Sequence, residues 1–352
     1  MHVRTGNELI WATRPFAVDV RWRSAVYALS TLAMLILFSV GAVWNIHPLA
    51  RIVSSLCSAL LLVRMFVIYH DYQHQAILRK ALWARILFTG FGLYILAPSS
   101  IWKRSHDYHH SHNSRLFNAS TGSYPIYTRQ EFLNASRSQR LAYLMVRHPL
   151  MIASAYLTHF LFSMCLRSFL RSPRRHYDSL IALLLHAALG VSVAVLLGWQ
   201  ALLLLVILPF AIASALGAYL FYAQHNFPGV IFRGSIEWSY EHAALESSSY
   251  MVMNPFWRWI TANIGYHHIH HLNARIPFYR LPEAMERIPE LQAAKTTSLH
   301  PVEIWRCLRL KLWDPDAMRM IPLSPALRRS RGSACSSRIQ SGRPDTEAAA
   351  SR

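Results

Sequence analysis

The stretch HDYHH at residues 106–110 decides the interpretation of this chain, because its histidine spacing recurs in two distant stretches. These are HDYQH at residues 70–74 and HHIHH at residues 267–271. On a helix, residues three and four positions apart lie on one face, with about 5–6 Å between Cβ atoms. Neutral imidazole is the commonest metal ligand in proteins. The three histidine boxes therefore predict that distant parts of the chain close around more than one metal ion.

Nine histidines are the candidate metal ligands and candidate catalytic residues. Eight come from the three boxes, and the ninth directly follows an apolar run that we expect to cross a membrane. They are His70, His74, His106, His109, His110, His225, His267, His270 and His271. The sequence leaves His112 and His268 open as further ligands. The other histidines are isolated, and we expect them to be ordinary polar side chains.

The hydrophobic content predicts a membrane protein. Hydrophobic residues make up 53% of the 352 residues, which is high for a soluble domain. Four apolar runs are long enough, at about 1.5 Å per helical residue, to cross a hydrocarbon core of about 30 Å. We expect Arg64, the one charge near the end of the second run, to snorkel toward the membrane surface. The predicted spans are residues 24–44, 52–69, 179–197 and 201–222.

Two shorter or interrupted apolar segments, 86–102 and 149–169, are expected to be interfacial or re-entrant helices rather than spans. Basic residues flank the spans on one side, whereas the turns at 45–48 and 198–200 contain no Lys or Arg. The positive-inside rule therefore places both termini and all the histidine groups on the cytosolic side. The predicted fold class is an all-α integral membrane protein with two transmembrane hairpins and a cytosolic helical cap that carries the metal site.

The expected domain organisation is simple. Residues 1–22 form a basic cytosolic lead, residues 23–324 form one domain, and the polar residues 325–352 form a disordered tail. Within the domain, residues 299–313 are expected to form an amphipathic helix. The net charge of +19 is scattered among membrane segments, which favours attraction to anionic lipid and argues against a nucleic-acid partner. An acidic electron-carrier protein is the alternative partner for these charges.

The kind of metal follows from the residues available. No Glu-x-x-His motif of the soluble di-iron carboxylate proteins is present. In the first box Asp71 stands where a zinc protease has its general-base Glu. Nine imidazoles suit two octahedral iron ions with a position left open for dioxygen. Because neutral ligands leave the metal charge uncompensated, we expect carboxylates to support the site, with Asp71, Asp107 and Glu241 as candidates.

With these three boxes the chain resembles the integral-membrane fatty acid desaturase superfamily over roughly residues 63–285. The family's boxes read His-x3–4-His, His-x2–3-His-His and His/Gln-x2–3-His-His, and each has its match here. Trp102-x3-His106 and the segment from His271 to Ala284 are most similar to the acyl-lipid Δ12/ω-3 branch. His268 departs from that branch, which usually has an apolar residue at this position.

The resemblance implies an oxidoreductase that inserts a cis double bond into a fatty acyl substrate. It implies two non-haem iron ions as cofactor, dioxygen as co-substrate, and two electrons from a ferredoxin or a b-type cytochrome. It also implies a multi-pass protein in contact with membrane lipid, most simply in a bacterial inner membrane with a cytosolic active site. An apolar slot must position one methylene. The aromatic residues that are possible slot liners are Tyr72, Trp102, Tyr108, Trp257 and Trp259.

Two other functions remain open from the residues alone. A related di-iron hydroxylase or ketolase, acting on an alkane, sterol or carotenoid, would have the same boxes and differ only in its product. A membrane metal-ion transporter would instead place its histidines along a path through the bilayer. The sequence leaves open the acyl chain length, the double-bond position and the acyl carrier.

Overall fold

The computed structural model describes residues 3–45, 47–116, 124–234 and 236–324, and these are mostly helical. Four helices are long and apolar enough to cross a membrane, so the predicted fold class is confirmed. The fourth is interrupted by a short π-helical turn, η3, between α11 and α12. The four are α2 (Arg21–Val43), α3 (Pro48–Gln73), α10 (Tyr177–Leu197), and the continuous segment of α11 (Trp199–Leu202), η3 (Leu203–Ile207) and α12 (Leu208–His225).

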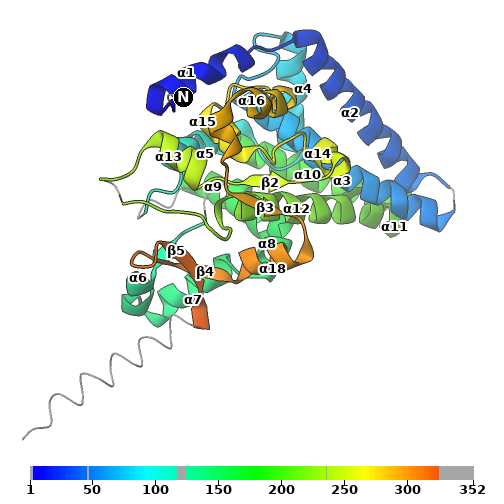
Figure 1. Ribbon diagram of the computed structural model, residues 1–352. Coiled ribbons are helices and arrows are strands. Elements are labelled where there is room, and N and C mark those ends of the chain that lie inside the picture. Colours follow the sequence, from blue (N-terminus) through cyan, green and yellow to red (C-terminus); the bar gives the residue numbers. More distant parts are fainter. Residues whose placement is uncertain (1–2, 46, 117–123, 235, 325–352) are drawn as a thin grey trace, which may run out of the picture.

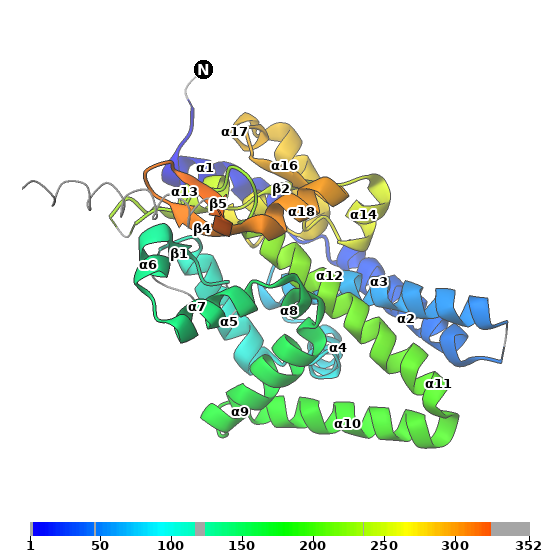
Figure 2. The ribbon, with the colours of Figure 1, turned by 90° about the horizontal axis from the view of Figure 1, so that it is seen from below.

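These helices form two hairpins that extend in the same direction, away from the remaining helices (Figures 1 and 2). Helix α3 packs against α2 in its own hairpin and against α12 in the other. Gly198, with a φ of +84°, makes the turn that ends α10 and lets α11 begin. Helices α3 and α12 both continue past their apolar runs. As a result, His70 and His225 lie in the last turns of membrane-crossing helices.

The predicted re-entrant segment is a pair of helices, α4 (Leu82–Tyr94) and α5 (Ser99–His112), that meet at 91°. The Tyr69 hydroxyl donates to the Ala97 carbonyl at 2.8 Å and thereby fixes the bend against α3. Gly92 permits this approach, because a Cβ there would lie 2.8 Å from the Tyr69 hydroxyl oxygen. The Asp178 carboxylate, at the start of α10, accepts from the Ser100 backbone N–H at 3.1 Å and holds the first turn of α5.

The second interrupted segment is helical from residue 149 onward and is not one of the four candidate spans. It packs against α10 and α12. It is helical but is not a candidate span, and its position at the membrane interface remains a prediction. Its parts are α8 (Pro149–Ala153), the π-helix η2 (Tyr156–Arg167) and α9 (Ser168–Arg171).

The cap lies at the end of α3 and α12 opposite the hairpin turns (Figures 1 and 2). The N-terminal helix α1 (Gly6–Thr13) and the turn η1 (Arg14–Phe16) lie across it, and Arg4 forms a 2.7 Å ion pair with Glu290. The remaining elements of the cap are short helices. They are α13 (Tyr240–Glu246), α14 (Pro255–Ile260), α15 (His267–Leu272), η4 (Phe278–Arg280), α16 (Leu281–Arg287) and α17 (Pro289–Gln292).

Two small sheets join segments that are far apart in the chain. One has the order β1-β4-β5, with β1 parallel to β4 in the register Tyr127↔Leu312 and β4 antiparallel to β5. In the other, β2 pairs in parallel with β3 in the register Tyr250↔Thr296. The strands are β1 (Tyr127–Thr128), β2 (Tyr250–Val252), β3 (Thr296–Ser298), β4 (Leu310–Asp314) and β5 (Arg319–Pro322), and α6 (Arg129–Asn134) and α7 (Arg137–Val146) follow β1.

The expectation of one amphipathic helix over residues 299–313 is wrong from residue 310 onward. Helix α18 (Pro301–Arg309) ends where β4 begins, and Leu310 and Leu312 are buried with the less buried Lys311 between them. That alternation has the period of a strand, and pairing with β1 and β5 supplies the missing backbone partners. The predicted disordered tail at 325–352 lies outside the described residues. The division at residues 22 and 324 remains a prediction.

Arg64 is buried, so the expectation that it snorkels to the surface is wrong. Its guanidinium donates to the Trp259 carbonyl and, at 3.1 Å, to the Thr31 hydroxyl. It also lies 4.2 Å from the centre of the Trp259 ring. The cation is therefore satisfied inside the protein, and it ties the first hairpin to α14 of the cap.

We expect Arg64→Ala to lower the free energy of unfolding by about 1–3 kcal/mol, because the Trp259 carbonyl and the Thr31 hydroxyl lose their donor. Thermal unfolding of the purified protein in detergent measures this. Arg85→Ala, at an exposed position on α4, is the matched control and should leave stability unchanged. Equal stability of the two variants would contradict the role assigned to Arg64.

Candidate metal centre

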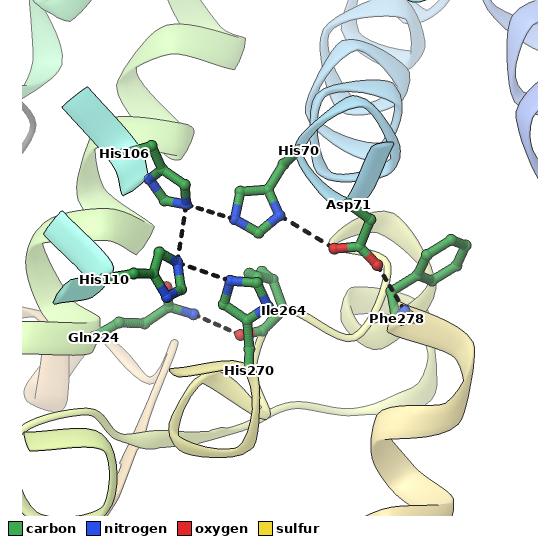
Figure 3. A network of polar contacts seen from close by, with 8 residues as sticks. All are labelled: His70, Asp71, His106, His110, Gln224, Ile264, His270 and Phe278. Carbon is green, nitrogen blue, oxygen red and sulfur yellow. Dashed lines mark hydrogen bonds and ion pairs between the residues drawn. The ribbon is translucent and has the colours of Figure 1, made fainter. Parts of the chain in front are cut away.

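All nine candidate histidines converge at one place beneath the cap. They come from the end of α3, from α5, from the end of α12 and from α15. They form two groups, and within each group the potential ligand atoms lie within 4.8 Å of one another. Figure 3 shows four members of the first group with their contacts. We call the groups the five-histidine group (His70, His74, His106, His110 and His270) and the four-histidine group (His109, His225, His267 and His271).

The nitrogen-to-nitrogen distances within each group are short and uniform. In the five-histidine group the Nε2–Nε2 distances are 2.9 Å for His70–His106, 3.1 Å for His106–His110 and 3.2 Å for His110–His270. In the four-histidine group they are 3.1 Å for His109–His225, 2.9 Å for His225–His267 and 3.1 Å for His267–His271.

These distances fit a metal ion. Imidazole nitrogens bound about 2.0–2.1 Å from one ion, at right angles to each other, are separated by about 3.0 Å. In addition, Nε2 of His74 is buried and has no hydrogen-bond partner among the described residues, although it belongs to the five-histidine group. A buried polar atom without a partner is costly unless something binds it. Each group can therefore hold one metal ion.

The helical spacing of the boxes explains how the histidines divide. The pairs four positions apart, 70 and 74, 106 and 110, and 267 and 271, each stay within one group because they share a helix face. The histidine three positions along, His109 or His270, faces the other group. The groups are thereby adjacent, and the rings of His110 and His271 stack with their centres 4.2 Å apart.

Two contacts orient the imidazoles from behind. The Nδ1 atom of His70 lies 3.2 Å from Asp71 Oδ1, and the other oxygen of Asp71 accepts from the Phe278 backbone N–H at 2.7 Å (Figure 3). The Nδ1 atom of His225 lies 3.1 Å from the Ser247 carbonyl oxygen. A proton held on Nδ1 leaves the Nε2 lone pair free to bind metal. Asp71 thus lies where the sequence analysis expected a supporting carboxylate.

The other two proposed carboxylates lie elsewhere, and the sequence expectation for them is corrected. Asp107 is half exposed and pairs with Lys103 at 2.6 Å, because one residue beyond His106 the helix has turned by about 100°. Glu241 accepts a hydrogen bond from the Gly6 backbone N–H and holds the N-terminal helix on the cap.

The two histidines left open by the sequence belong to neither group. His268 lies inside the third box, but its Nε2 atom is 3.1 Å from the Leu291 carbonyl oxygen. His112 stacks on the ring of Tyr108 at the exposed side of α5. The structure therefore leaves the nine-residue set unchanged, and the ligand role of these residues remains a prediction.

Backbone contacts that the sequence pattern did not indicate hold the third box in place. Met251 in β2 donates its backbone N–H to the Gly265 carbonyl at 2.8 Å, just before the box. A Cβ at residue 265 would lie 2.6 Å from the Met251 carbonyl oxygen, so only glycine fits there without displacement. The Gln224 side chain, next to His225, donates to the Ile264 carbonyl at 2.9 Å (Figure 3).

Burial keeps the histidines of the third box neutral at pH 7. Desolvation lowers the pKa of His267, His270 and His271 well below the ordinary value of 6.5, and neighbouring histidines lower it further. Neutral imidazoles bind metal without first losing a proton, so the site is ready for a cation at physiological pH.

An apolar cavity of about 800 Å³ reaches both histidine groups, with His70, His106 and His267 in its wall. Of the five aromatic residues named as possible liners, Trp102 lines it and also stacks on the His106 ring at 4.6 Å. About half of the other apolar liners, such as Phe66 and Phe210, lie on spanning helices, where periodicity does not separate a cavity wall from a lipid-facing side chain.

Comparison with known proteins gives consistent results. The family model described as fatty acid desaturase matches residues 42–302. A protein of Bacillus subtilis named "Fatty acid desaturase" is 32% identical over 289 residues, which cover 80% of this chain and 82% of that protein. The "Omega-6 fatty acid desaturase, chloroplastic" of Spinacia oleracea is 25% identical over 305 residues, and that of Brassica napus is 25% identical over 286 residues. The matches cover 82% and 77% of this chain but only 63% and 60% of the two plant proteins.

We expect the purified protein to contain about two metal ions, one for each histidine group. His70→Ala removes a ligand from one group and His267→Ala from the other, so each variant should lose about one ion. Elemental analysis by mass spectrometry measures the content. His112→Ala, on the same helix as His109 but outside both groups, should retain both ions; wild-type content in the His70 and His267 variants would contradict the grouping.

The stability of the metal-free protein should fall as the pH drops below about 6.5. The folded state keeps these histidines neutral while the unfolded chain takes up protons, so acid favours unfolding. Below this pH, each such histidine lowers the free energy of unfolding by up to about 1.4 kcal/mol per pH unit. Thermal unfolding of chelator-treated protein between pH 7 and pH 5 tests this, and an unchanged midpoint would contradict it.

Proposed function

The chain belongs to the fatty acid desaturase family, and from this premise we propose that it inserts a cis double bond into a fatty acyl chain. As a member of this family it is an oxidoreductase that acts on a fatty acyl substrate. We propose that the two histidine groups hold two iron ions, that dioxygen is the co-substrate, and that two electrons per turnover come from an external donor.

One observation carries this proposal: two histidine groups, each fit to hold an ion, adjoin the same apolar cavity. An alkyl C–H bond has no usable acidity, so side-chain acids and bases cannot remove its hydrogen. Bound iron supplies the one-electron oxygen chemistry that this step requires. Iron is among the metals that imidazole ligands bind well.

The protein's own residues hold and orient the reactants. Asp71 and the Ser247 carbonyl fix the orientation of His70 and His225 from behind. Trp102 and the apolar wall keep water away and align one acyl segment beside the histidines. Two hydrogens leave adjacent methylenes and, with two external electrons and two protons, one dioxygen becomes two waters.

The site residues proposed for this reaction are the nine histidines of the two groups, supported by Asp71. We propose a ferredoxin or a b-type cytochrome as the electron donor, membrane lipid as the immediate surroundings, and the cytosolic side of a bacterial inner membrane as the location. The absence of Lys and Arg from the hairpin turns supports that side. The histidines at the ends of α3 and α5 contact each other. The chain therefore returns, through the bend between α4 and α5, to the side of the membrane on which α4 begins.

The test is expression in a host with simple fatty acids, followed by mass spectrometry of its lipids. We expect acyl chains with two hydrogens fewer, and His270→Ala should abolish them because it removes one of the proposed metal ligands. His112→Ala should retain activity. A gain of one oxygen would favour a hydroxylase or ketolase instead, and stoichiometric zinc without dioxygen uptake would favour metal transport.

A further inference from the structure

A second cavity, of about 240 Å³, also reaches the metal centre, and the proposed reaction leaves it unused. We call it the polar cavity, and we call the larger cavity of about 800 Å³ the apolar cavity. His109 and His225 line the polar cavity, and both belong to the four-histidine group. The five-histidine group contributes liners to the apolar cavity instead, namely His70 and His106. The polar cavity therefore leads to the four-histidine group.

An aromatic wall separates the two cavities. Among the residues that the structure describes, Tyr124 and Phe221 are the only ones that line both. Their ring centres lie 6.5 Å apart, and the Phe221 ring centre lies 4.9 Å from that of His109. A molecule in one cavity is thus divided by these two rings from a molecule in the other.

The polar cavity runs from the protein surface inward. Its liners His112, on α5, and Glu131, on α6, are half-buried, whereas Arg147 and Tyr222 are completely buried. Side chains that donate or accept hydrogen bonds are present at both ends. A water molecule occupies about 30 Å³ in the liquid, so the cavity has room for several. Its size and its polar lining therefore suit a file of water molecules.

The buried cation in its wall indicates that water belongs there. Within the described residues, the Arg147 guanidinium donates only to neutral oxygens, among them the Pro125 carbonyl at 2.9 Å and the side chain of Asn226. Its Nε atom is buried and has no hydrogen-bond partner in that part of the chain. A buried donor in this state is costly unless something accepts its hydrogen bond, and ordered water commonly does so.

The four-histidine group is also the one that has more room for a small ligand. An octahedral ion held by four imidazoles has more open positions than one held by five. The proposed reaction takes up protons and releases water beside these ions. Water that crosses an apolar wall gives up its hydrogen bonds, which is unfavourable, so a polar route is the easier one.

We propose that the polar cavity is a water passage to the four-histidine group. Water enters through it to fill the open positions of the ion, brings protons to the centre, and leaves through it as product. The inference rests on the proposed function, because it names the route for the protons and the water of that reaction. Ligands of the size of water should therefore reach the ion through the polar cavity and not through the apolar one.

Azide tests the passage, because it is small and polar and absorbs visible light when it is bound to ferric iron. The protein is loaded with iron in both groups and oxidised, and azide binding is followed by stopped flow. Ile126→Trp places a large ring in the wall of the polar cavity. It should slow azide binding by about tenfold or more, since the ring must move before azide passes.

Gly217→Phe is the matched variant, because it narrows the apolar cavity. A Cβ at this position meets no atom within 4 Å, so the larger side chain has space. This variant should bind azide as fast as the wild type does. Leu141→Trp, exposed on α7 and outside both cavities, controls for the added ring and should also keep the wild-type rate.

Leu116→Phe narrows the polar cavity from the segment after α5 and should slow azide binding as well. It replaces Ile126→Trp if that variant loses iron, and the iron content of every variant shows that both groups are intact. Wild-type rates in the variants of the polar cavity would overturn the proposal. So would equal or greater slowing by Gly217→Phe, or the lack of an azide band in the iron-loaded wild type.

The relaxation of solvent protons measures water itself, because paramagnetic iron speeds the relaxation of water that exchanges at its open positions. This enhancement should persist in Gly217→Phe and largely disappear in Ile126→Trp; an unchanged enhancement in Ile126→Trp would refute the passage. These outcomes are separate from the proposed function. Azide binding that depends on the polar cavity, with no double bond in any lipid, refutes desaturation alone. Desaturation with azide rates that are the same in all variants refutes the water passage alone.

Discussion

The rest of the structure depends on one constraint: nine imidazoles must sit with their nitrogens about 3 Å apart in a buried place. Such a cluster is unfavourable when protonated, because the positive charges repel and burial opposes them. It is also poorly satisfied when neutral, because Nε2 of His74 has no hydrogen-bond partner among the residues that the structure describes. One cation in each group would resolve both problems, because the distances between the nitrogens fit metal–nitrogen bonds of about 2.0–2.1 Å.

The arrangement of the helices follows from the need to bring histidines of four elements into one buried cluster. Helices α3 and α12 deliver theirs directly, because each runs past its apolar stretch. Helix α5 has to turn back, and the Tyr69–Ala97 and Ser100–Asp178 hydrogen bonds fix the bend that allows it. Helix α15 is not an extension of a membrane helix, so β2 and the close approach at Gly265 help to set its position.

The same arrangement gives the centre two different sides. On the cap side, the Ser247 carbonyl orients His225, and the Phe278 backbone N–H holds the Asp71 carboxylate of α3, which orients His70. The membrane helices and the helical segment 149–171 leave an apolar cavity on the other side, with His70, His106 and His267 in its wall. An apolar cavity beside the histidines suits the acyl chain of a fatty acyl substrate.

Local periodicity in the sequence determined the four spans, the re-entrant and interfacial helices, and the nine histidines, because helical spacing and apolar length act within one segment. It also indicated Asp71, which adjoins a box. It failed for Arg64, Glu241 and the strand after Arg309, whose partners are far away in the chain. It also failed for Asp107, which lies on the exposed side of α5 and pairs with Lys103 on the same helix. Which histidines form one group, and where the cavity lies beside them, were decided only by tertiary packing, since α3, α5, α12 and α15 meet through contacts that no local pattern encodes.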